Sequence, residues 1–553
     1  MGEPLKIIPL GGLGEIGLNM MAIEYGDSIM VVDCGLMFPE DYMLGIDIVI
    51  PDVSYLKKNA EKVKAYIITH GHEDHTGALP FILPQVDAPI YGTALTIGLI
   101  EEKLEEFGLA KSTLFETVRP RDRVSIGPFD IEFIRVSHSI VDGCGLAIRT
   151  PVGTVIHTGD FKMDQTPVDG EVMDYARFSE YGESGVLLLM SDSTNVEKEG
   201  YSLSEREIGK NLEEIFRRCE GRIIVAAFSS NIHRIQQVME AAARHGRRVI
   251  LNGKSMVANV RIAHALGYLK YPEGLMADLK EIDSIPHDQV VLLTTGSQGE
   301  PMSALTRMAM DNHKQIKVRK GDTVILSSKF IPGHEKAIST MMNHLYRRGA
   351  DVIYEKVSEV HVSGHASQEE LKIMLNMVRP KYFIPVHGEY RHLVLHSRLA
   401  ARIGIPEENV IIAEDGDVVE FAPEGGFVKA GKVESGRVFV DGKGVGDVGE
   451  MVLKDRNHLA QDGMVLALVA INATTGDMVY GPEIVTRGLV LEEGRPGLIE
   501  EARKVVIESL NSLNAEVKTE QLEIKEEVRR ALRRYFNRTL ERKPVILPMI
   551  IEI

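Results

Sequence analysis

The chain has 553 residues and a formal net charge of −17, with 44% hydrophobic and 26% charged residues. This length indicates roughly three or four domains at ~150 residues each, and the ordinary composition excludes a collagen, coiled-coil or disordered chain as the main architecture. The acidic balance excludes a protein that binds polyanions through bulk charge, although a local basic groove or a metal cluster could still bind nucleic acid.

The first two hundred residues predict strands divided by glycine-rich turns. The strands are expected at Lys6–Leu10, Met20–Glu24, Ile29–Val32, Lys64–Thr69, Asp130–Val136, Thr154–His157 and Val186–Met190. A helical pattern over Thr96–Phe107 lies among them, so we predict an α/β fold with layered sheets. The segment Gly12–Gly17 fits the GxGxxG pattern of dinucleotide sites, but strands follow it where such a site needs a helix. We therefore predict a glycine-rich loop there.

From about Ser204 helices and strands alternate, which predicts parallel βαβ units. The expected elements are helix Glu205–Cys219, strand Arg222–Ala227, helix Ile232–Arg244, and strands Arg248–Leu251, Val290–Thr295 and Thr323–Ser327. A later strand, Tyr382–Val386, is similar to those of the first region. We therefore predict that a domain at 205–360 is inserted into a discontinuous domain formed by 1–204 and 361–448.

The C-terminal residues 456–553 predict a separate small α/β domain after a glycine- and valine-rich linker region at 431–455. The expected elements are strands Val465–Ile471, Met478–Tyr480 and Val545–Ile553, and helices Pro496–Leu513 and Glu523–Arg538. Four arginines recur at helical spacing in the last helix: Arg529, Arg530, Arg533 and Arg534. They either bind RNA or form a solvated face that pairs with Glu526 and Glu527.

The strongest chemical motif is the segment His70–His75, whose sequence is HGHEDH. Three histidines and an aspartate in six residues follow an expected strand, and this density of nitrogen and oxygen donors favours a metal site over a polar surface loop. His138, Asp160 and His387 each lie just past another expected strand. Because α/β sheets place their sites beyond the carboxyl ends of strands, we expect these side chains to meet in one cleft.

These motifs resemble the metallo-β-lactamase superfamily, which implies an αββα sandwich. The resemblance implies that His70, His72 and His138 hold one metal, that Asp74, His75 and His387 hold another, and that Asp160 bridges them. Asp33 resembles the family's first motif, an aspartate that braces the histidine loop. Zn²⁺ is the expected metal, and Mn²⁺ also suits these ligands.

Two zinc ions, two aspartates and a bridging hydroxide would leave a site of charge +1, which suits an anionic substrate such as a phosphodiester. We therefore expect metal-assisted hydrolysis at phosphorus. Asp192 in Ser191–Thr194 and His365 in Val362–Ser367 resemble motifs of the β-CASP subgroup, the nucleic-acid-processing branch with an inserted domain. That resemblance implies that Ser363, Gly364 and His365 contact the scissile phosphate, that His365 assists catalysis, and that Asp192 orients the histidines.

Three further segments resemble ribonuclease J: Ile8–Gly17, Phe228–Arg234 and Thr295–Pro301. This resemblance covers essentially the whole chain. It implies a 5′-to-3′ exonuclease on single-stranded RNA that prefers 5′-monophosphate ends, with some endonuclease activity and roles in RNA maturation and decay. It also implies a homodimer or homotetramer through the C-terminal domain, and partners in RNA degradation.

A predicted phosphate pocket lies at Ser229, Ser230, Asn231 and Arg234, because hydroxyls and backbone N–H groups at a helix start bind phosphate. A helix cap with a surface arginine explains these residues equally well. Two other functions stay open. The first is a thioesterase or lactonase with the same fold, and the second is an RNA-binding scaffold without activity.

The three cysteines, Cys34, Cys144 and Cys219, include no CxxC pair and cannot form a disulfide framework, so a reducing compartment fits best. No apolar run approaches the ~18 residues of a membrane span, and no secretory signal is visible. We therefore expect a cytoplasmic protein that makes no membrane contact.

Overall fold

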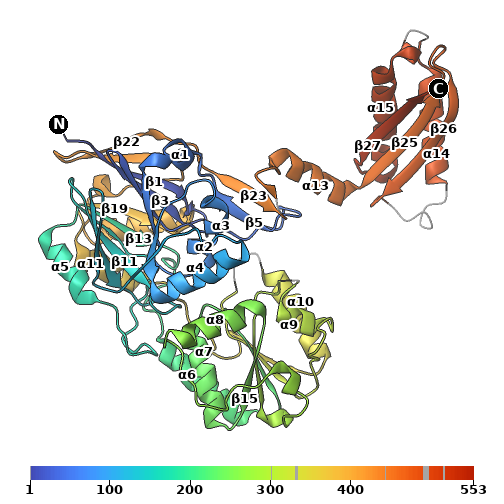
Figure 1. Ribbon diagram of the computed structural model, residues 1–553. Coiled ribbons are helices and arrows are strands. Elements are labelled where there is room, and N and C mark those ends of the chain that lie inside the picture. The colour runs from blue at the N-terminus through green and yellow to red at the C-terminus, as the bar shows by residue number, and fades with distance from the viewer. Residues whose placement is uncertain (1, 301, 331–333, 443, 490–496, 515–516) are drawn as a thin grey trace. The chain divides into compact units, whose positions relative to one another are not determined.

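The computed structural model describes residues 2–300, 302–330, 334–442, 444–489, 497–514 and 517–553. The chain forms two compact units (Figure 1). The first comprises Met1–Phe38 and Ile48–Val438, and the second comprises Pro39–Asp47 and Phe439–Ile553. The described residues contain no helix with the length and hydropathy needed to cross a membrane.

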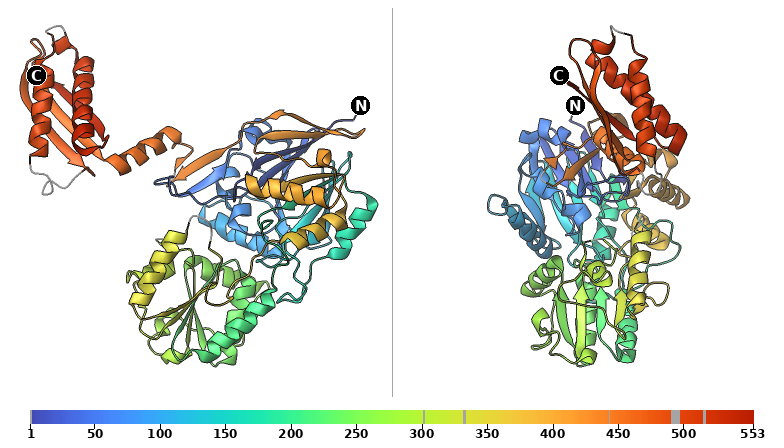
Figure 2. Two further views of the ribbon diagram at one scale, coloured as in Figure 1. Left: turned by 180° about the vertical axis from the view of Figure 1, so that it is seen from behind. Right: turned by 90° about the vertical axis from the view of Figure 1, so that its right-hand side faces the viewer.

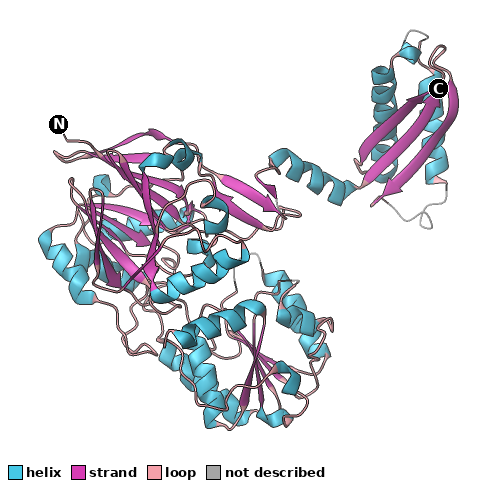
Figure 3. Ribbon diagram, in the orientation of Figure 1, coloured by secondary structure: helices cyan, strands magenta, loops and turns pink. Residues whose placement is uncertain are grey.

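Two stacked sheets build the larger part of the first unit (Figure 3). The strands of the eight-stranded sheet are, in spatial order, β22 (Phe427–Lys432), β21 (Asp417–Phe421), β1 (Leu5–Gly11), β3 (Met20–Tyr25), β4 (Ser28–Val32), β6 (Val63–Ile67), β7 (Ile90–Thr93) and β8 (Phe115–Val118). The strands of the six-stranded sheet are β19 (Tyr382–Val386), β13 (Leu188–Asp192), β12 (Thr154–His157), β11 (Cys144–Arg149), β10 (Phe129–Arg135) and β9 (Arg123–Ile126).

One apolar core lies between these sheets, with Ile7 and Met30 from the first and Phe133 and Leu188 from the second. The other face of the six-stranded sheet packs on α5 (Tyr175–Ser184), α11 (Gln368–Val378) and α12 (Tyr390–Arg402). The remaining elements are α1 (Ser54–Lys58), α2 (Glu73–Thr76), α3 (Leu79–Ile82), α4 (Ala94–Glu106), β5 (Ile48–Pro51), and the pair β2 (Leu13–Gly14) and β20 (Gly388–Glu389). The expected αββα sandwich is confirmed.

A five-stranded parallel sheet forms the inserted domain, which Figure 2 shows in green and yellow with helices on both faces. Its strands are β15 (Arg248–Asn252), β16 (Val290–Thr294), β14 (Ile223–Ala226), β17 (Thr323–Leu326) and β18 (Asp351–Ile353). The covering helices are α6 (Glu205–Arg218), α7 (Ile232–Arg244), α8 (Lys254–Ala265), α9 (Ala304–Ala309) and α10 (Glu335–Arg347). Strands such as β14 and β16 are buried along their whole length, as their unbroken apolar sequences predict for a sheet covered twice.

The chain returns to the sandwich after the insertion, because β19 pairs in parallel with β13, and β21 pairs with β1. The order of these strands confirms the insertion that the change in sequence pattern predicted. Several strand ends differ from the prediction by one or two residues, and the end of β13 bears on the site: β13 extends to Asp192, so this aspartate is the last residue of the strand.

The second unit holds a three-stranded sheet of β26 (Met478–Arg487), β25 (Met464–Ile471) and β27 (Val545–Glu552). The helices α14 (Leu498–Asn511) and α15 (Gln521–Leu540) pack on one face of it. Strand β26 continues seven residues past the expected end at Tyr480. The expected helix start at Pro496 lies outside the described residues.

The predicted linker region 431–455 is structured in part. It contains β23 (Arg437–Asp441), β24 (Gly444–Val445) and the start of α13 (Glu450–Asp462). Helix α13 was not predicted, because it is amphipathic only weakly and buries a single residue, Leu453. Arg529, Arg530 and Arg534 of α15 each pair with Glu526 or Glu527, as the solvated-face interpretation expects.

Candidate metal centre

Loops at the ends of strands from both sheets converge on one cluster of ligand-type side chains. Loop His70–His75 follows β6, and Asp33 follows β4, in the eight-stranded sheet. His138, Asp160 and His387 follow β10, β12 and β19 of the six-stranded sheet. Among the described residues the ligand atoms fall into three groups, and within each group all atoms lie within 4.8 Å of one another. The third group, Asp160, Asp192, His365 and His387, shares Asp160 and His387 with the second.

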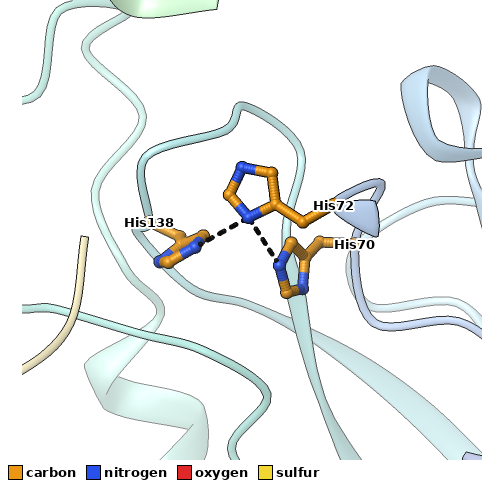
Figure 4. Close-up of side chains that lie close together, drawn as sticks. All are labelled: His70, His72 and His138. Carbon is orange, nitrogen blue, oxygen red and sulfur yellow. Dashed lines mark hydrogen bonds between the residues drawn. The ribbon is translucent and has the colours of Figure 1, made fainter. Parts of the chain in front are cut away.

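The first group contains three imidazoles, those of His70, His72 and His138 (Figure 4). Nδ1 of His72 lies 3.0 Å from Nε2 of His70 and 3.2 Å from Nε2 of His138. Burial of His72 and His138 lowers their imidazole pKa to about 4 and about 3. These histidines are therefore neutral at pH 7, and a neutral ring nitrogen is the form that binds a metal.

The second group contains His75, His387 and Asp74, together with Asp160. Nε2 of His387 lies 3.3 Å from Oδ2 of Asp74, and Nε2 of His75 lies 3.6 Å from the same oxygen. Burial opposes protonation of His387, but the carboxylates of Asp160 and Asp74 outweigh it and raise its pKa to about 9. This group is therefore richer in negative charge than the first.

Asp160 connects the two groups through one carboxylate oxygen. Its Oδ2 lies 3.7 Å from Nε2 of His70 and of His138, 3.3 Å from Nε2 of His75 and 3.5 Å from Nε2 of His387. The side chain is almost fully buried. Burial raises the pKa of its carboxyl, but the surrounding histidines outweigh this effect and hold the pKa well below its usual range.

The ring nitrogens that face away from the cluster are held by hydrogen bonds. His138 Nδ1 donates to the carbonyl oxygen of Gly364 at 2.8 Å, and His75 Nδ1 bonds Oδ2 of Asp33 at 2.8 Å. His70 Nδ1 contacts the Thr69 hydroxyl at 3.1 Å, and His387 Nδ1 contacts the Thr194 hydroxyl. Such bonds fix the ring orientation and leave Nε2 free, as in metal-ligating histidines.

Two residues of this framework adopt positive φ angles although they are not glycine. Asp33 has φ of 62° and His387 has φ of 56°. Such backbone costs energy and persists only where the surroundings enforce it. At Asp33 the Oδ1 oxygen accepts a hydrogen bond from the backbone N–H of Thr69 at 2.8 Å, so this carboxylate also contacts the start of the histidine loop.

Asp192 and His365 lie at the open side of the cluster. Nδ1 of His365 lies 2.8 Å from Oδ2 of Asp192, and 21% of the His365 side chain is exposed against 1% for Asp192. Burial lowers the pKa of His365, but the Asp192 carboxylate outweighs it, so the net shift is upward. The Asp192 carboxylate thereby extends the pH range in which His365 stays protonated.

The donor set suits divalent metal ions. Imidazole nitrogens and carboxylate oxygens are the ligands that zinc takes in catalytic sites, and Mn²⁺ also accepts them. The buried Asp160 carboxylate, the neutral His72 and His138, and the bonds behind four of the five rings fit such ions better than an ordinary polar core. The residues present therefore fit a metal centre.

The predicted phosphate pocket of the inserted domain is different. Arg234 is fully buried, and its guanidinium bonds the Glu205 carboxylate at 2.7 Å and the side chains of Gln237 and Ser327. Asn231 is buried as the N-cap of α7. The helix-cap interpretation is therefore correct for Asn231, but Arg234 is neither a phosphate contact nor a surface arginine, because it is buried. Of the four residues, only Ser229 and Ser230 are partly exposed.

Sequence reasoning missed three framework residues. Asn19 contacts Nε2 of His75 at 3.2 Å and the Asp74 carbonyl oxygen at 3.1 Å, both through Nδ2. Thr69 and Thr194 stand behind His70 and His387. Thr69, next to the histidine motif, and Thr194, two residues after Asp192, could have been suspected from their positions in the sequence, whereas Asn19 could not.

Four family profiles match the chain. They are described as metallo-beta-lactamase superfamily (residues 13–192), ribonuclease J beta-CASP domain (220–345), Zn-dependent metallo-hydrolase RNA specificity domain (349–413) and ribonuclease J C-terminal domain (451–553). Together they follow the order of the observed sheets.

Relatives match over nearly the whole length. A ribonuclease J of Thermus thermophilus is 45% identical over 100% of this chain and 96% of its own. One of Synechocystis is 44% identical over 99% and 87%, and ribonuclease J2 of Bacillus subtilis is 42% identical over 100% and 99%. A solved structure from Enterococcus faecalis, titled a protein of unknown function, has 16% identity and a TM-score of 0.54. It covers 76% of this chain and 100% of that chain, and supports the fold alone.

Proposed function

The chain belongs to the ribonuclease J family, and from this membership and the metal centre we propose that it is a 5′-to-3′ exonuclease on single-stranded RNA. That it is a metal-dependent ribonuclease follows from the family itself. The proposal adds a preference for 5′-monophosphate ends, an additional endonuclease activity, and roles in RNA maturation and decay. The observation that carries it is the position of Asp160 Oδ2 among four imidazoles of two ligand groups.

We propose two ions per chain, zinc in preference to manganese. His70, His72 and His138 would hold one, and Asp74, His75 and His387 the other, with Asp160 shared. Bound divalent ions supply Lewis acidity and lower the pKa of water, which is the chemistry that hydrolysis at phosphorus needs. The aspartates Asp74 and Asp160 set the charge of the site. Asn19 contacts Asp74, and Thr194 contacts His387, so both orient ligands of the second proposed ion.

His365 is the proposed proton donor to the leaving oxygen. Its Nδ1 bonds Asp192, so Nε2 is the atom left to give a proton, and the upward shift of its pKa favours the protonated form that a general acid needs. Asp192 acts through His365 by orienting the ring. Ser363 and Gly364, on the same turn, would contact the phosphate, and Ser363 Oγ also accepts the His365 backbone N–H at 3.2 Å.

The exposed face of the C-terminal sheet supports a homodimer or homotetramer. Its register places Leu466 opposite Leu547 and Leu468 opposite Met549, on the face away from α14 and α15. Leu547 and Met549 are 45% and 49% exposed, and such a contiguous apolar surface indicates an interface. Leu547→Glu is expected to shift sedimentation toward the monomer, whereas Val428→Glu on β22 is expected to leave it unchanged.

The domain limits 1–204 with 361–448, 205–360, and 456–553 after the linker region stay proposals, as do cytoplasmic location and partners that degrade RNA. Of the other functions, a thioesterase or lactonase would not need a histidine such as His365 paired to Asp192 beside the ligands. An inactive scaffold would not need to keep every ligand, and each predicted ligand lies in the cluster.

The deciding experiment follows degradation of a 3′-labelled single-stranded RNA that carries either a 5′-monophosphate or a 5′-triphosphate. The monophosphate RNA is expected to shorten from its 5′ end, and chelation is expected to stop cleavage. His365→Ala is expected to slow cleavage by ~10²–10⁴-fold, the usual contribution of general acid catalysis. His458→Ala, in the second unit, is the control and is expected to cleave RNA at the wild-type rate. If the protein holds two ions and leaves the RNA intact, the proposal that RNA is the substrate is refuted, and thioester and lactone assays would follow.

A further inference from the structure

The loop that carries His138 is packed into the inserted domain. It connects β10 to β11 and is closed by a hydrogen bond from the backbone N–H of Val136 to the carbonyl oxygen of Gly143 at 3.1 Å. Ile140 and Val141, at the tip of the loop, are 1% and 4% exposed and belong to the apolar core of the inserted domain. One end of this loop is therefore a candidate metal ligand, and its tip is part of another domain's core.

A polar contact fixes the same loop. The Tyr268 hydroxyl, from the segment after α8, donates a hydrogen bond to Oδ2 of Asp142 at 2.5 Å. Asp142 has φ of 68°, an unfavourable backbone that its surroundings must hold. The carboxyl group is mostly buried beside the backbone N–H of Leu95, at 3.5 Å. Tyr268 thus bonds the one strained residue between His138 and β11.

The imidazole of His138 makes a further contact, with the chain segment that follows the inserted domain. Nδ1 of His138 donates to the carbonyl oxygen of Gly364, which follows that domain in sequence. His138 is therefore held between two segments. Both contact the inserted domain, because Val362, two residues before Gly364, belongs to the same apolar core as Ile140 and Val141. His70 and His72, in contrast, belong to a loop that is braced within the sandwich by Asp33 and Thr69.

We propose that Tyr268 is a positioning residue of the metal centre. Through Asp142 it orients the loop of His138, so that metal affinity at the position of His70, His72 and His138 depends on the placement of the inserted domain. Because such coupling is reciprocal, metal bound at this position also stabilises that placement. The inference rests on the proposed metal roles of these histidines, and it assigns the inserted domain a part in building the centre.

The test is a zinc titration of the full chain against a competing chelator, with no RNA present. Tyr268→Phe removes only the hydroxyl and is expected to weaken one of the two bound ions by about 10-fold, the lower end of what losing a partner behind a ligand costs, and to leave the other unchanged. Tyr271→Phe, three residues along the same segment, is the matched control and is expected to change neither.

Two variants of Asp142 separate positioning from loss of structure. Asp142→Asn keeps a carbonyl acceptor for Tyr268 and tolerates positive φ, so it is expected to retain both affinities. Asp142→Ala is expected to behave as Tyr268→Phe. The Co²⁺ absorption spectrum should change for the same two variants, because it reports the geometry around the ion.

The outcomes are distinguishable. Unchanged affinity of both ions in Tyr268→Phe would overturn the inference, and equal weakening of both ions would also overturn it, since that indicates general destabilisation. A wild-type protein that binds fewer than two ions would instead refute the proposed metal roles. Failure to cleave RNA would refute the proposed substrate and leave this titration unaffected.

Discussion

The two ligand groups of the metal centre are built in different ways. The group of Asp74, His75 and His387 is braced inside the sandwich, by Asp33 behind His75 and by Thr194 behind His387. The group of His70, His72 and His138 draws one ligand from a loop whose tip lies in the core of the inserted domain. The first arrangement is local to one domain, and the second depends on how two domains pack.

The two groups also differ in charge. Carboxylates surround His75 and His387 and raise their imidazole pKa values, against the effect of burial. In the other group burial dominates and the pKa values of His70, His72 and His138 are lowered. A neutral, domain-dependent position beside a charged, locally braced one indicates that the two ions should differ in affinity and in their response to mutation.

The largest expected effect comes from the atom that both groups share. Asp160→Ala removes Oδ2 from four imidazoles and is expected to weaken both ions by ~100-fold or more, with RNA cleavage lost. Metal analysis after dialysis and the RNA assay measure this. Asp169→Asn, in the following segment, should retain two ions. Retention of either ion by Asp160→Ala would mean that the aspartate serves one position alone.

Asp33→Asn is expected to affect the sandwich-braced position more than the other, because Asp33 contacts His75 directly and the loop of His70 only through Thr69. Asparagine tolerates the φ of 62° but cannot accept the His75 Nδ1–H in the same way, so affinity should fall by ~10–100-fold at one position. The zinc titration described for Tyr268 measures it, with Asp27→Asn as an exposed control. If Asp33→Asn weakens the same ion as Tyr268→Phe, the proposed difference between the two ligand groups is wrong.

Gly364→Ala is expected to have a smaller effect, and to weaken the ion at the His138 position more than the ion at the sandwich-braced position. A Cβ atom at this position would stand 2.7 Å from Cε1 and Nδ1 of His138, so the ring must move. We expect about 10-fold weaker binding at the His138 position, since the partner behind the ligand is displaced and not removed. Gly143→Ala, whose Cβ would meet its neighbours at 3.7 Å and beyond, is the control. Equal affinities in the two alanine variants would contradict the steric argument.

The smallest expected effect concerns the outer frame of the sandwich-braced position. Leu13 pairs with Gly388, next to His387, and its backbone N–H donates to Oδ1 of Asp415 at 3.1 Å. Burial, together with the charge of Glu15, raises the pKa of Asp415 to about 8. The folded state therefore binds this proton more tightly than the unfolded state, and stability is lost as pH rises from about 4 to about 8.

Asp415→Asn keeps the acceptor and removes the titration. It should raise the melting temperature at pH 8 and flatten the loss of stability between pH 4 and 8, as followed by thermal unfolding. Asp417→Asn is the control of opposite sign. Burial raises the pKa of the Asp417 carboxyl, but hydrogen bonds from the Glu414 backbone and from Lys429 outweigh this and lower it, so its loss should destabilise above pH 4. A destabilised Asp415→Asn at pH 8 would contradict the assignment.

Local patterns were sufficient for most elements and for the ligand set. Strands β12 and β19 and helix α7 begin and end where the sequence predicts. The reason is that burial of one or both faces produces a recognisable pattern of apolar residues along the sequence. The histidine motif was recognisable because its donors are adjacent in sequence. The family resemblance that these residues carry is confirmed by relatives over the full length.

The partners of these residues were beyond local patterns. Arg234 has the sequence setting of a phosphate contact, yet it is buried against Glu205, 29 residues away. Helix α13 has no strong hydrophobic periodicity, and Asn19 and Tyr268 belong to no motif. Thr194 lies in the motif of Asp192, but its contact with His387, 193 residues away, depends on the fold.

The sequence by itself determined the kind of centre, because metal ligation depends on donor chemistry that a few neighbouring residues display. Only the tertiary structure decided how each ligand is held. His138 is held by Gly364, 226 residues away, and His387 meets Asp74 across 313 residues. Such contacts depend on how sheets and domains pack, and the packing is selected by the total burial of the chain, which no single stretch of sequence records.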